Sequence, residues 1–234
     1  MRYEWLFLDA DGTLFDYDSA ESNALRAAFL ESGLAYGDEA LATYRAFNRA
    51  VWVEFENGTM SAATLRVRRF EQLFAALGLE ADAAAFSPRY LEHLSRGTEL
   101  LEGAERLVRT LRGRVGMALI TNGLKDVQRP RLRGSALHGL FDHVIVSDEI
   151  GVAKPSAGFF DIAFDAAGAP AKEKVLVIGD SLTSDIQGGI DYGVDTCWFN
   201  PRGASADPRY PATYEIRSLP ELYPLVGLAP DPAG

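Results

Sequence analysis

Two patterns of apolar residues divide the chain. Residues 16–96 carry apolar positions at helical spacing, as at Leu65, Phe70 and Leu73, with no convincing strand between them. From there to the C-terminus short apolar runs alternate with helical segments, and one further apolar run, 3–8, opens the chain. Alternation of this kind predicts a parallel sheet covered by helices on both faces.

The predicted fold is therefore α/β, with a three-layer Rossmann-like parallel sheet core and an inserted all-helical cap domain. We assign residues 1–15 and 97–234 to the core and residues 16–96 to the cap, which enters directly after the first strand. At the start of the first cap helix, Asp18 followed by Glu21 is typical of a capping box. The helical insertion thus begins close to the end of the first strand.

The first strand delivers two carboxylates to its C-terminal end. Asp9 follows the apolar run, Asp11 comes two residues later, and Gly12 allows the backbone to turn away. Carboxylates held so close repel each other, and a divalent cation relieves that repulsion. Asp and Gly also favour ordinary turns, so this stretch alone leaves the turn interpretation open.

Three later stretches follow in a particular order. An apolar strand ends in Thr121, an isolated Lys154 stands in a loop, and a further apolar strand ends in Gly179-Asp180. Ligands of open α/β sheets bind outside the carboxyl ends of the strands, so Asp9, Thr121 and Asp180 are expected to meet in one crevice.

Together these stretches resemble the four signature motifs of the haloacid dehalogenase superfamily, most of whose members are Mg-dependent phosphohydrolases. The resemblance implies that Asp9 is a nucleophile that forms an aspartyl-phosphate, while Asp11 acts as general acid and then general base. It implies Mg²⁺ as the cofactor. The metal ligands would be the Asp9 side chain, the Asp11 backbone carbonyl and the Asp180 side chain.

The remaining motif positions receive roles from the same resemblance. Thr121, Asn122 and Gly123 would bind phosphate oxygens, and Lys154 would offset the charge of carboxylates and phosphate. Asp185 lies five residues beyond Asp180 and would support the site from behind the metal ligands. A simple helix-capping role for Asp185 fits the sequence equally well.

Other chemistries of the superfamily fit less well. Its dehalogenases typically lack the acid at the position of Asp11, and its phosphonatases use a cap lysine, whereas residues 17–95 contain no lysine. A sugar-phosphate phosphatase or phosphomutase on the same scaffold stays open as an alternative. A non-catalytic binding protein with vestigial activity is a second alternative, although such a protein is expected to have lost Asp9 or Lys154.

The cap sequence around residues 47–70 resembles a subgroup of bacterial pyrimidine 5'-nucleotidases. This chain departs from the subgroup at Gly12, where the subgroup often has Glu. An aromatic such as Trp52 can stack on a base, and Asn48 or Arg69 can hydrogen-bond its edge. Helical spacing also suits Trp52 as cap core, so substrate specificity at these residues is a hypothesis.

The composition of the chain limits the classes of binding partner that we expect. The net charge of -10 argues against a nucleic acid polymer or an anionic membrane. Cys197 is the only cysteine among the 234 residues, which fits a reducing compartment, and no apolar segment is long enough to span a bilayer. We therefore expect a cytoplasmic phosphatase for small phosphorylated metabolites, in particular a pyrimidine nucleoside 5'-monophosphate. The oligomeric state is not predicted.

Overall fold

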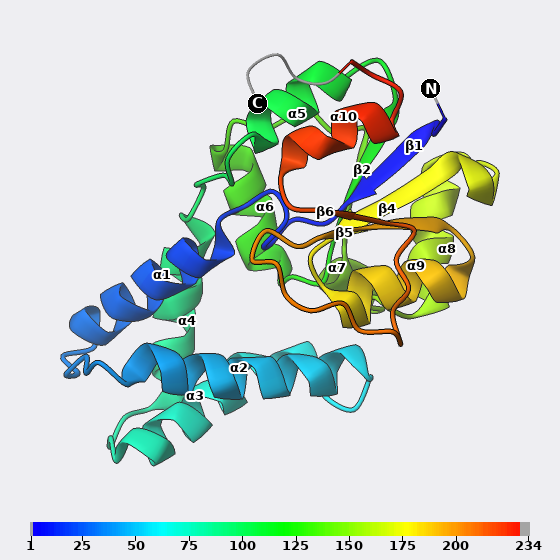
Figure 1. The fold of residues 1–234 in the computed structure, drawn as a ribbon. Coiled ribbons are helices and arrows are strands. Elements are labelled where there is room, and N and C mark those ends of the chain that lie inside the picture. Colours follow the sequence, from blue (N-terminus) through cyan, green and yellow to red (C-terminus); the bar gives the residue numbers. More distant parts are fainter. Residues whose placement is uncertain (1, 230–234) are drawn as a thin grey trace.

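A six-stranded parallel sheet forms the centre of the molecule (Figure 1). The structure is a computed structural model that describes residues 2–229. The strand order is β3-β2-β1-β4-β5-β6. The strands are β1 (Trp5–Leu8), β2 (Gly116–Thr121), β3 (His143–Val146), β4 (Val175–Gly179), β5 (Asp195–Phe199) and β6 (Tyr214–Ile216).

Helices cover both faces of this sheet, which confirms the predicted α/β fold class. Alternate residues of β1 explain the two faces, because Leu6 and Leu8 pack into one apolar cluster and Phe7 into the other. The helices of the core are α5 (Ala104–Leu111), α6 (Lys125–Gly134), α7 (Ser147–Ile150), α8 (Ala157–Ala166), α9 (Gln187–Tyr192) and α10 (Leu222–Leu225). Shorter turns are the 3₁₀ segments Lys172–Lys174 and Leu219–Glu221 and the π-helical segment Leu182–Ile186.

The position of β1 determines where the functional groups meet. It lies between β2 and β4, with Leu8 in register with Leu119 on one side and with Ile178 on the other. Because all three strands are parallel, their carboxyl ends open at one edge of the sheet. Asp9 therefore emerges between the ends of β2 and β4.

The inserted segment forms a separate group of four helices beside the sheet (Figure 1). They are α1 (Tyr17–Glu31), α2 (Ala40–Glu56), α3 (Ala62–Leu77) and α4 (Ala83–Ser95). Interlocking aromatic rings fill their interior, with Phe70 packed against both Phe86 and Tyr90. All four helices lie within residues 16–96, and the exact domain boundaries stay a prediction.

Two linker segments join the cap to the core and run beside each other. The amide of Asp16 donates to the carbonyl of Glu99 at 3.0 Å, and the amide of Leu101 donates to the carbonyl of Leu14 at 2.9 Å. These bonds pair the outgoing linker with the returning one. The cap is thus held through a short paired stretch immediately after Asp11.

The first cap helix is capped differently from the prediction. The side chain of Asp16 accepts from the amide of Ser19 at 3.0 Å, so Asp16 is the N-cap and the capping box predicted at Asp18 is wrong. Asp18 lies within the first helical turn. Glu21 instead turns into the protein, where it is buried.

Within residues 2–229, no helix has both the length and the apolarity needed to cross a bilayer.

Cys197 provides a test of the packing of β5. Its side chain is buried in the sheet, and this burial raises the pKa of the thiol to about 12. Because the thiolate is the reactive form, we expect no reaction of native protein with Ellman's reagent at mildly alkaline pH. Protein unfolded in guanidinium should release one equivalent of thionitrobenzoate, and rapid reaction of the native protein would contradict the packing described for β5.

Candidate active site

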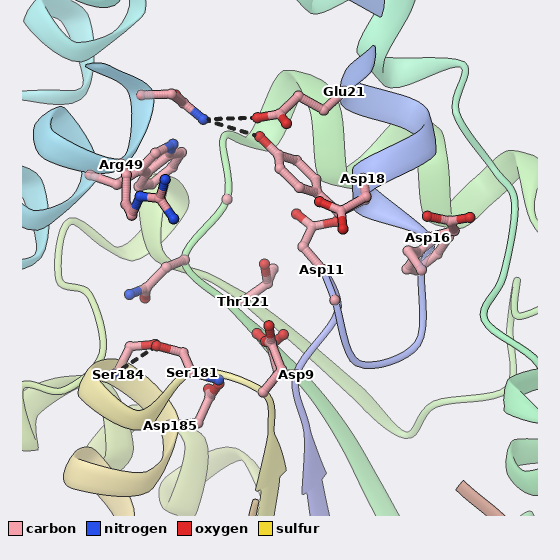
Figure 2. Close-up of a pocket in the computed structure, with 18 of the residues that line it drawn as sticks. Asp9, Asp11, Asp16, Asp18, Glu21, Arg49, Thr121, Ser181, Ser184 and Asp185 are labelled. Atoms are coloured by element: carbon pink, nitrogen blue, oxygen red, sulfur yellow. Dashed lines mark hydrogen bonds between the residues drawn. The ribbon is translucent and has the colours of Figure 1, made fainter. Parts of the chain in front are cut away.

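A cavity of about 860 Å³ lies between the carboxyl edge of the sheet and the cap. All the site residues predicted from the sequence line it, from both the core and the cap. They are Asp9, Asp11, Asn48, Trp52, Arg69, Thr121, Asn122, Gly123, Lys154, Asp180 and Asp185. Figure 2 shows Asp9, Asp11 and Thr121 gathered on one side of this space, with Arg49 of α2 across from them. The fold thus collects residues far apart in sequence into one site.

Lys154 is the central cation in the half of the cavity that the core domain lines. Its ammonium group donates to Asp9 Oδ1 at 2.6 Å, to Asp185 Oδ1 at 2.7 Å and to the backbone carbonyl of Ile120 at 2.9 Å. The side chain is 1% exposed, so these three acceptors replace its hydration shell. The ammonium group therefore ties the end of β1 to the end of β2 and to the segment after β4.

Burial and crowding of charge shift the pKa values of these groups. Burial raises the pKa of Asp9 well above its ordinary value, against the effect of Lys154, and the charges of Asp185 and Asp180 raise it further. Burial and then the charge of Asp185 raise the pKa of Asp180 to about 7. Burial alone would lower the pKa of Lys154, but Asp185 and Asp9 outweigh it and raise that pKa. The site therefore holds more negative charge than Lys154 balances.

The donor atoms suit a hard divalent cation. Carboxylate oxygens of Asp9, Asp180 and Asp185 lie within 4.8 Å of one another. Asp185 was predicted to stand behind the metal ligands, and its two oxygens accept from Lys154 and from the amide of Ser181 at 3.2 Å. An oxygen-binding cation such as Mg²⁺ would supply the missing positive charge here.

Backbone contacts fix Asp180 in this arrangement. Its backbone amide donates to the hydroxyl of Thr13 at 3.1 Å, and its backbone carbonyl accepts from the indole N–H of Trp198 at 3.0 Å. Gly12 has a φ of 83°, and a Cβ added there would lie 2.6 Å from Asp180 Oδ2. In this chain the glycine thus permits the close approach of the two loops that carry the carboxylates.

Asn122 connects the predicted phosphate loop to the loop of Lys154. Its side-chain oxygen accepts from the Lys154 amide at 2.8 Å, and its side-chain nitrogen donates to the Lys154 carbonyl at 2.7 Å. The same nitrogen donates to Glu56 of the cap at 3.0 Å. Asn122 therefore fixes the backbone that carries Lys154 and also contacts the cap helix α2.

A different set of residues holds Asp11. Gln128 Nε2 donates to Asp11 Oδ2 at 2.5 Å, and Arg131 donates to Asp11 Oδ1. Both donors lie on α6, and the Asp11 side chain is 24% exposed toward the cavity. The two carboxylates that follow β1 are thus separately held, Asp9 by Lys154 and Asp11 by α6.

The cap half of the cavity contains a buried polar network. Asn48 donates to Glu21 Oε1 at 3.2 Å and accepts from Arg69 Nη1 at 3.1 Å, and Arg69 also donates to the hydroxyl of Tyr44. Nε and Nη2 of Arg69 are buried without a hydrogen-bond partner in the described structure. Arg69 therefore orients Asn48, while the half-buried Trp52 forms part of the cavity wall.

Some residues of the site were missed by the sequence analysis. Glu56, Gln128 and Arg131 carry no motif and sit on helices whose polar positions look like ordinary solvent-facing residues. The detectable signal was Glu56 at the end of α2, immediately before Asn57-Gly58, where a helix end brings a side chain toward a neighbouring loop. Their partners lie far away in the sequence, so these contacts depend on tertiary packing, which single-sequence patterns do not determine.

The fold and the site together define a class, namely α/β proteins with paired carboxylates after the first strand and a helical cap over the carboxyl edge of the sheet. The family model for haloacid dehalogenase-like hydrolases matches residues 3–193. The chain belongs to this family, which confirms the resemblance described from the sequence, and it is a hydrolase.

Several relatives match nearly the whole chain. The HAD-hydrolase YfnB of Bacillus subtilis is 37% identical over 97% of each chain. The pyrimidine 5'-nucleotidase YjjG of Escherichia coli is 34% identical over 97% of this chain and 99% of its own. The pyrimidine 5'-nucleotidase PynA of Streptococcus pneumoniae is 36% identical over 95% of this chain and 94% of its own.

A solved structure extends this similarity to three dimensions. The crystal structure of YfnB bound to magnesium superposes with a TM-score of 0.91 at 36% identity. The match covers 97% of this chain and 100% of that one. Both the core and the cap are therefore shared with a magnesium-bound relative.

Replacing Lys154 by Met tests the charge balance of the core half. Without the ammonium group, Asp9 and Asp185 lose their cation in a buried site, and we expect unfolding free energy to fall by about 3–5 kcal/mol. Urea denaturation of metal-free protein in EDTA measures this change. Lys174→Met is the matched control, because Lys174 is a surface lysine, and an equal effect of both substitutions would contradict the role described for Lys154.

Proposed function

We propose that the protein is a Mg²⁺-dependent phosphomonoesterase that hydrolyses small nucleoside 5'-monophosphates, with pyrimidine nucleotides as the preferred class. The observation that carries the proposal is the cluster of Asp9, Asp180 and Asp185 around the Lys154 ammonium group at the floor of a capped cavity. The nucleotidases YjjG and PynA support the substrate class, since they match this chain over nearly its full length.

Asp9 is the nucleophile in this proposal. Its Oδ1 is bound by Lys154, which leaves Oδ2 to attack the phosphorus atom and form an aspartyl-phosphate. The pKa of Asp9 is raised by burial, so positive charge is needed to keep the carboxylate ionised and nucleophilic. Lys154 supplies part of that charge, and Mg²⁺, which Asp9, Asp180 and the backbone carbonyl of Asp11 would hold, would supply the rest.

Asp11 is the general acid and general base in this proposal. In the first step it gives a proton to the departing oxygen of the ester, and in the second it takes one from the water that attacks the aspartyl-phosphate. Thr121 and the backbone of Asn122 and Gly123 bind the phosphoryl oxygens, and Lys154 balances their charge as the transition state forms. The alcohol leaves in the first step. In the second step water cleaves the aspartyl-phosphate, which releases phosphate and regenerates the free Asp9 carboxylate.

The cap chooses the leaving group. Trp52 and Asn48 face the cavity from α2, opposite the catalytic floor, so an aromatic face and an amide meet whatever group is esterified to the phosphate. A nucleobase has both a π-face and a hydrogen-bonding edge, which makes it a suitable partner for this pair. Arg69 contributes by holding the amide of Asn48 in place.

The central test is phosphate release from nucleoside monophosphates and sugar phosphates with and without Mg²⁺. We expect turnover with nucleotides, its loss in EDTA, and its recovery on addition of Mg²⁺. Asp9→Asn should lower turnover by about 10⁴-fold or more, because covalent catalysis loses its nucleophile, with an unchanged circular dichroism spectrum. Turnover that survives chelation would remove the metal from the mechanism. Isomer interconversion without free phosphate would instead identify a phosphomutase.

A substitution in the cap tests the choice of substrate. Trp52→Leu removes the stacking surface, and we expect kcat/KM for a pyrimidine nucleoside monophosphate to fall about 10-fold, in line with 1–3 kcal/mol per stacked base. Ribose 5-phosphate should lose little, because it has no aromatic ring to stack. Val53→Ala, an exposed neighbour, serves as the control. Parallel losses on both substrates would show that Trp52 supports the cap and does not select the base.

A further inference from the structure

Arg131 lies where three parts of the active site meet, and none of the four motifs includes it. Its guanidinium donates through Nη1 to Asp11 Oδ1 and through Nε to the backbone carbonyl of Gly97 at 2.7 Å. It also stacks over the ring of Phe15, with 4.8 Å between Cζ and the ring centroid. The side chain is 0% exposed, so a full positive charge is held in the protein interior by these contacts.

The contacts of Arg131 reach both linkers of the cap. Phe15 belongs to the outgoing linker and Gly97 begins the returning one, and Phe15 forms a bridge with Leu100 of the returning segment. Gly97 itself packs closely on α1, since a Cβ added there would lie 2.5 Å from Cβ of Ala20. One guanidinium group therefore connects the Asp11 carboxylate to the backbone on which the cap is carried.

Gln128 completes the hold on Asp11. Its amide donates to the second Asp11 oxygen, and it packs against the phosphate loop so tightly that a Cβ on Gly123 would lie 2.3 Å from Gln128 Nε2. Gln128 and Arg131 are three residues apart on α6 and so lie on the same face of that helix. With one donor on each oxygen, the Asp11 carboxylate is fixed in both position and rotation.

Asp11 does not need two donors for its own stability, whereas proton transfer needs a carboxyl group that is held in place. A carboxylate on a partly exposed loop is stable without a buried partner, yet burying an arginine costs free energy unless its donors are satisfied. Nη2 of Arg131 is buried without a hydrogen-bond partner among the described residues. A general acid, in contrast, must be held in a defined geometry, because a misplacement of about 1 Å costs on the order of 10²-fold in rate.

We propose that Arg131 is a positioning residue that orients the Asp11 carboxylate for proton transfer and couples that orientation to the backbone of the returning cap linker. The inference rests on the proposed function, because it assigns Arg131 to the proton-transfer step of phosphate ester cleavage. In that step the ester P–O bond breaks, the leaving oxygen takes its proton from Asp11, and the phosphoryl group passes to Asp9. Arg131 touches neither substrate nor phosphate and acts only through Asp11.

The test compares two substrates of similar shape whose leaving groups differ in their need for a proton. p-Nitrophenyl phosphate releases a stable phenolate without protonation, whereas benzyl phosphate releases an alkoxide that must be protonated. Arg131→Met should lower kcat/KM for benzyl phosphate about 10- to 100-fold and for p-nitrophenyl phosphate less than about 3-fold. A loss of general folding or packing would lower both rates alike, so the ratio of the two reports the position of the acid.

Two further variants support the comparison. Arg131→Lys keeps the charge but not the planar fork that reaches Asp11 and Gly97 together, so it should show the same selective loss at a smaller size. This variant decides the question if Arg131→Met fails to fold, as judged by its thermal unfolding. Arg133→Met is the control, because Arg133 lies on the same helix with an exposed side chain, and it should match the wild type on both substrates.

The outcomes separate this inference from the proposed function. Equal losses on both substrates, or an Arg131→Lys enzyme that matches the wild type, would overturn the positioning role while the phosphatase assignment stands. A wild-type protein that releases phosphate from neither substrate in the presence of Mg²⁺ would overturn the proposed function and the role of Arg131 with it. A selective loss on benzyl phosphate in the variants supports both.

Discussion

The structure of the site depends on the balance between one buried ammonium group and the carboxylates around it. Lys154 binds Asp9 and Asp185 at 2.6 and 2.7 Å, with Asp180 close by. In a buried site these charges interact strongly, so each is tolerable only while the others are present. One cation cannot neutralise the group, and the remaining negative charge is what makes the site attractive to a divalent metal.

The parallel sheet makes that balance possible. A strand that ends in the middle of a parallel sheet has a neighbour ending on each side, and β1 with β2 and β4 on its flanks supplies Asp9, Thr121 and Asp180 from three separate parts of the sequence. The apolar residues of these strands bury both faces of the sheet, which holds the ends rigidly. Rigid placement matters because charges brought together in this way repel one another until a ligand arrives.

The cap meets the core through polar contacts around the cavity and through apolar packing, in which Leu124 and Val127 join the apolar cluster of the cap. Glu56 accepts from Asn122, Arg66 pairs with Asp148 at 3.2 Å, and Arg202 pairs with Asp18 at 3.0 Å. Exposed ion pairs of this kind each contribute little to stability, so the apolar contact at α6 is an important part of the interface. The paired linkers and Arg131 lie at the base of this interface, so the cap, which lines one half of the cavity, is connected closely to the Asp11 carboxylate.

The sequence by itself determined the strands, the helical insertion and the residues at the strand ends, because apolar periodicity and short motifs are local properties of the chain. It placed β3, β4 and β5 at the residues where the structure has them, and it named Asp9, Thr121, Lys154 and Asp180 as one group. Only the tertiary structure decided that Asp16 caps α1, that Arg69 supports Asn48 from inside the cap, and that Gln128 and Arg131 hold Asp11. The Asp16 cap is a local choice between two neighbouring aspartates. The partners of Asn48 and Asp11 come from elements distant in sequence, and their pairing depends on tertiary packing that no local pattern encodes.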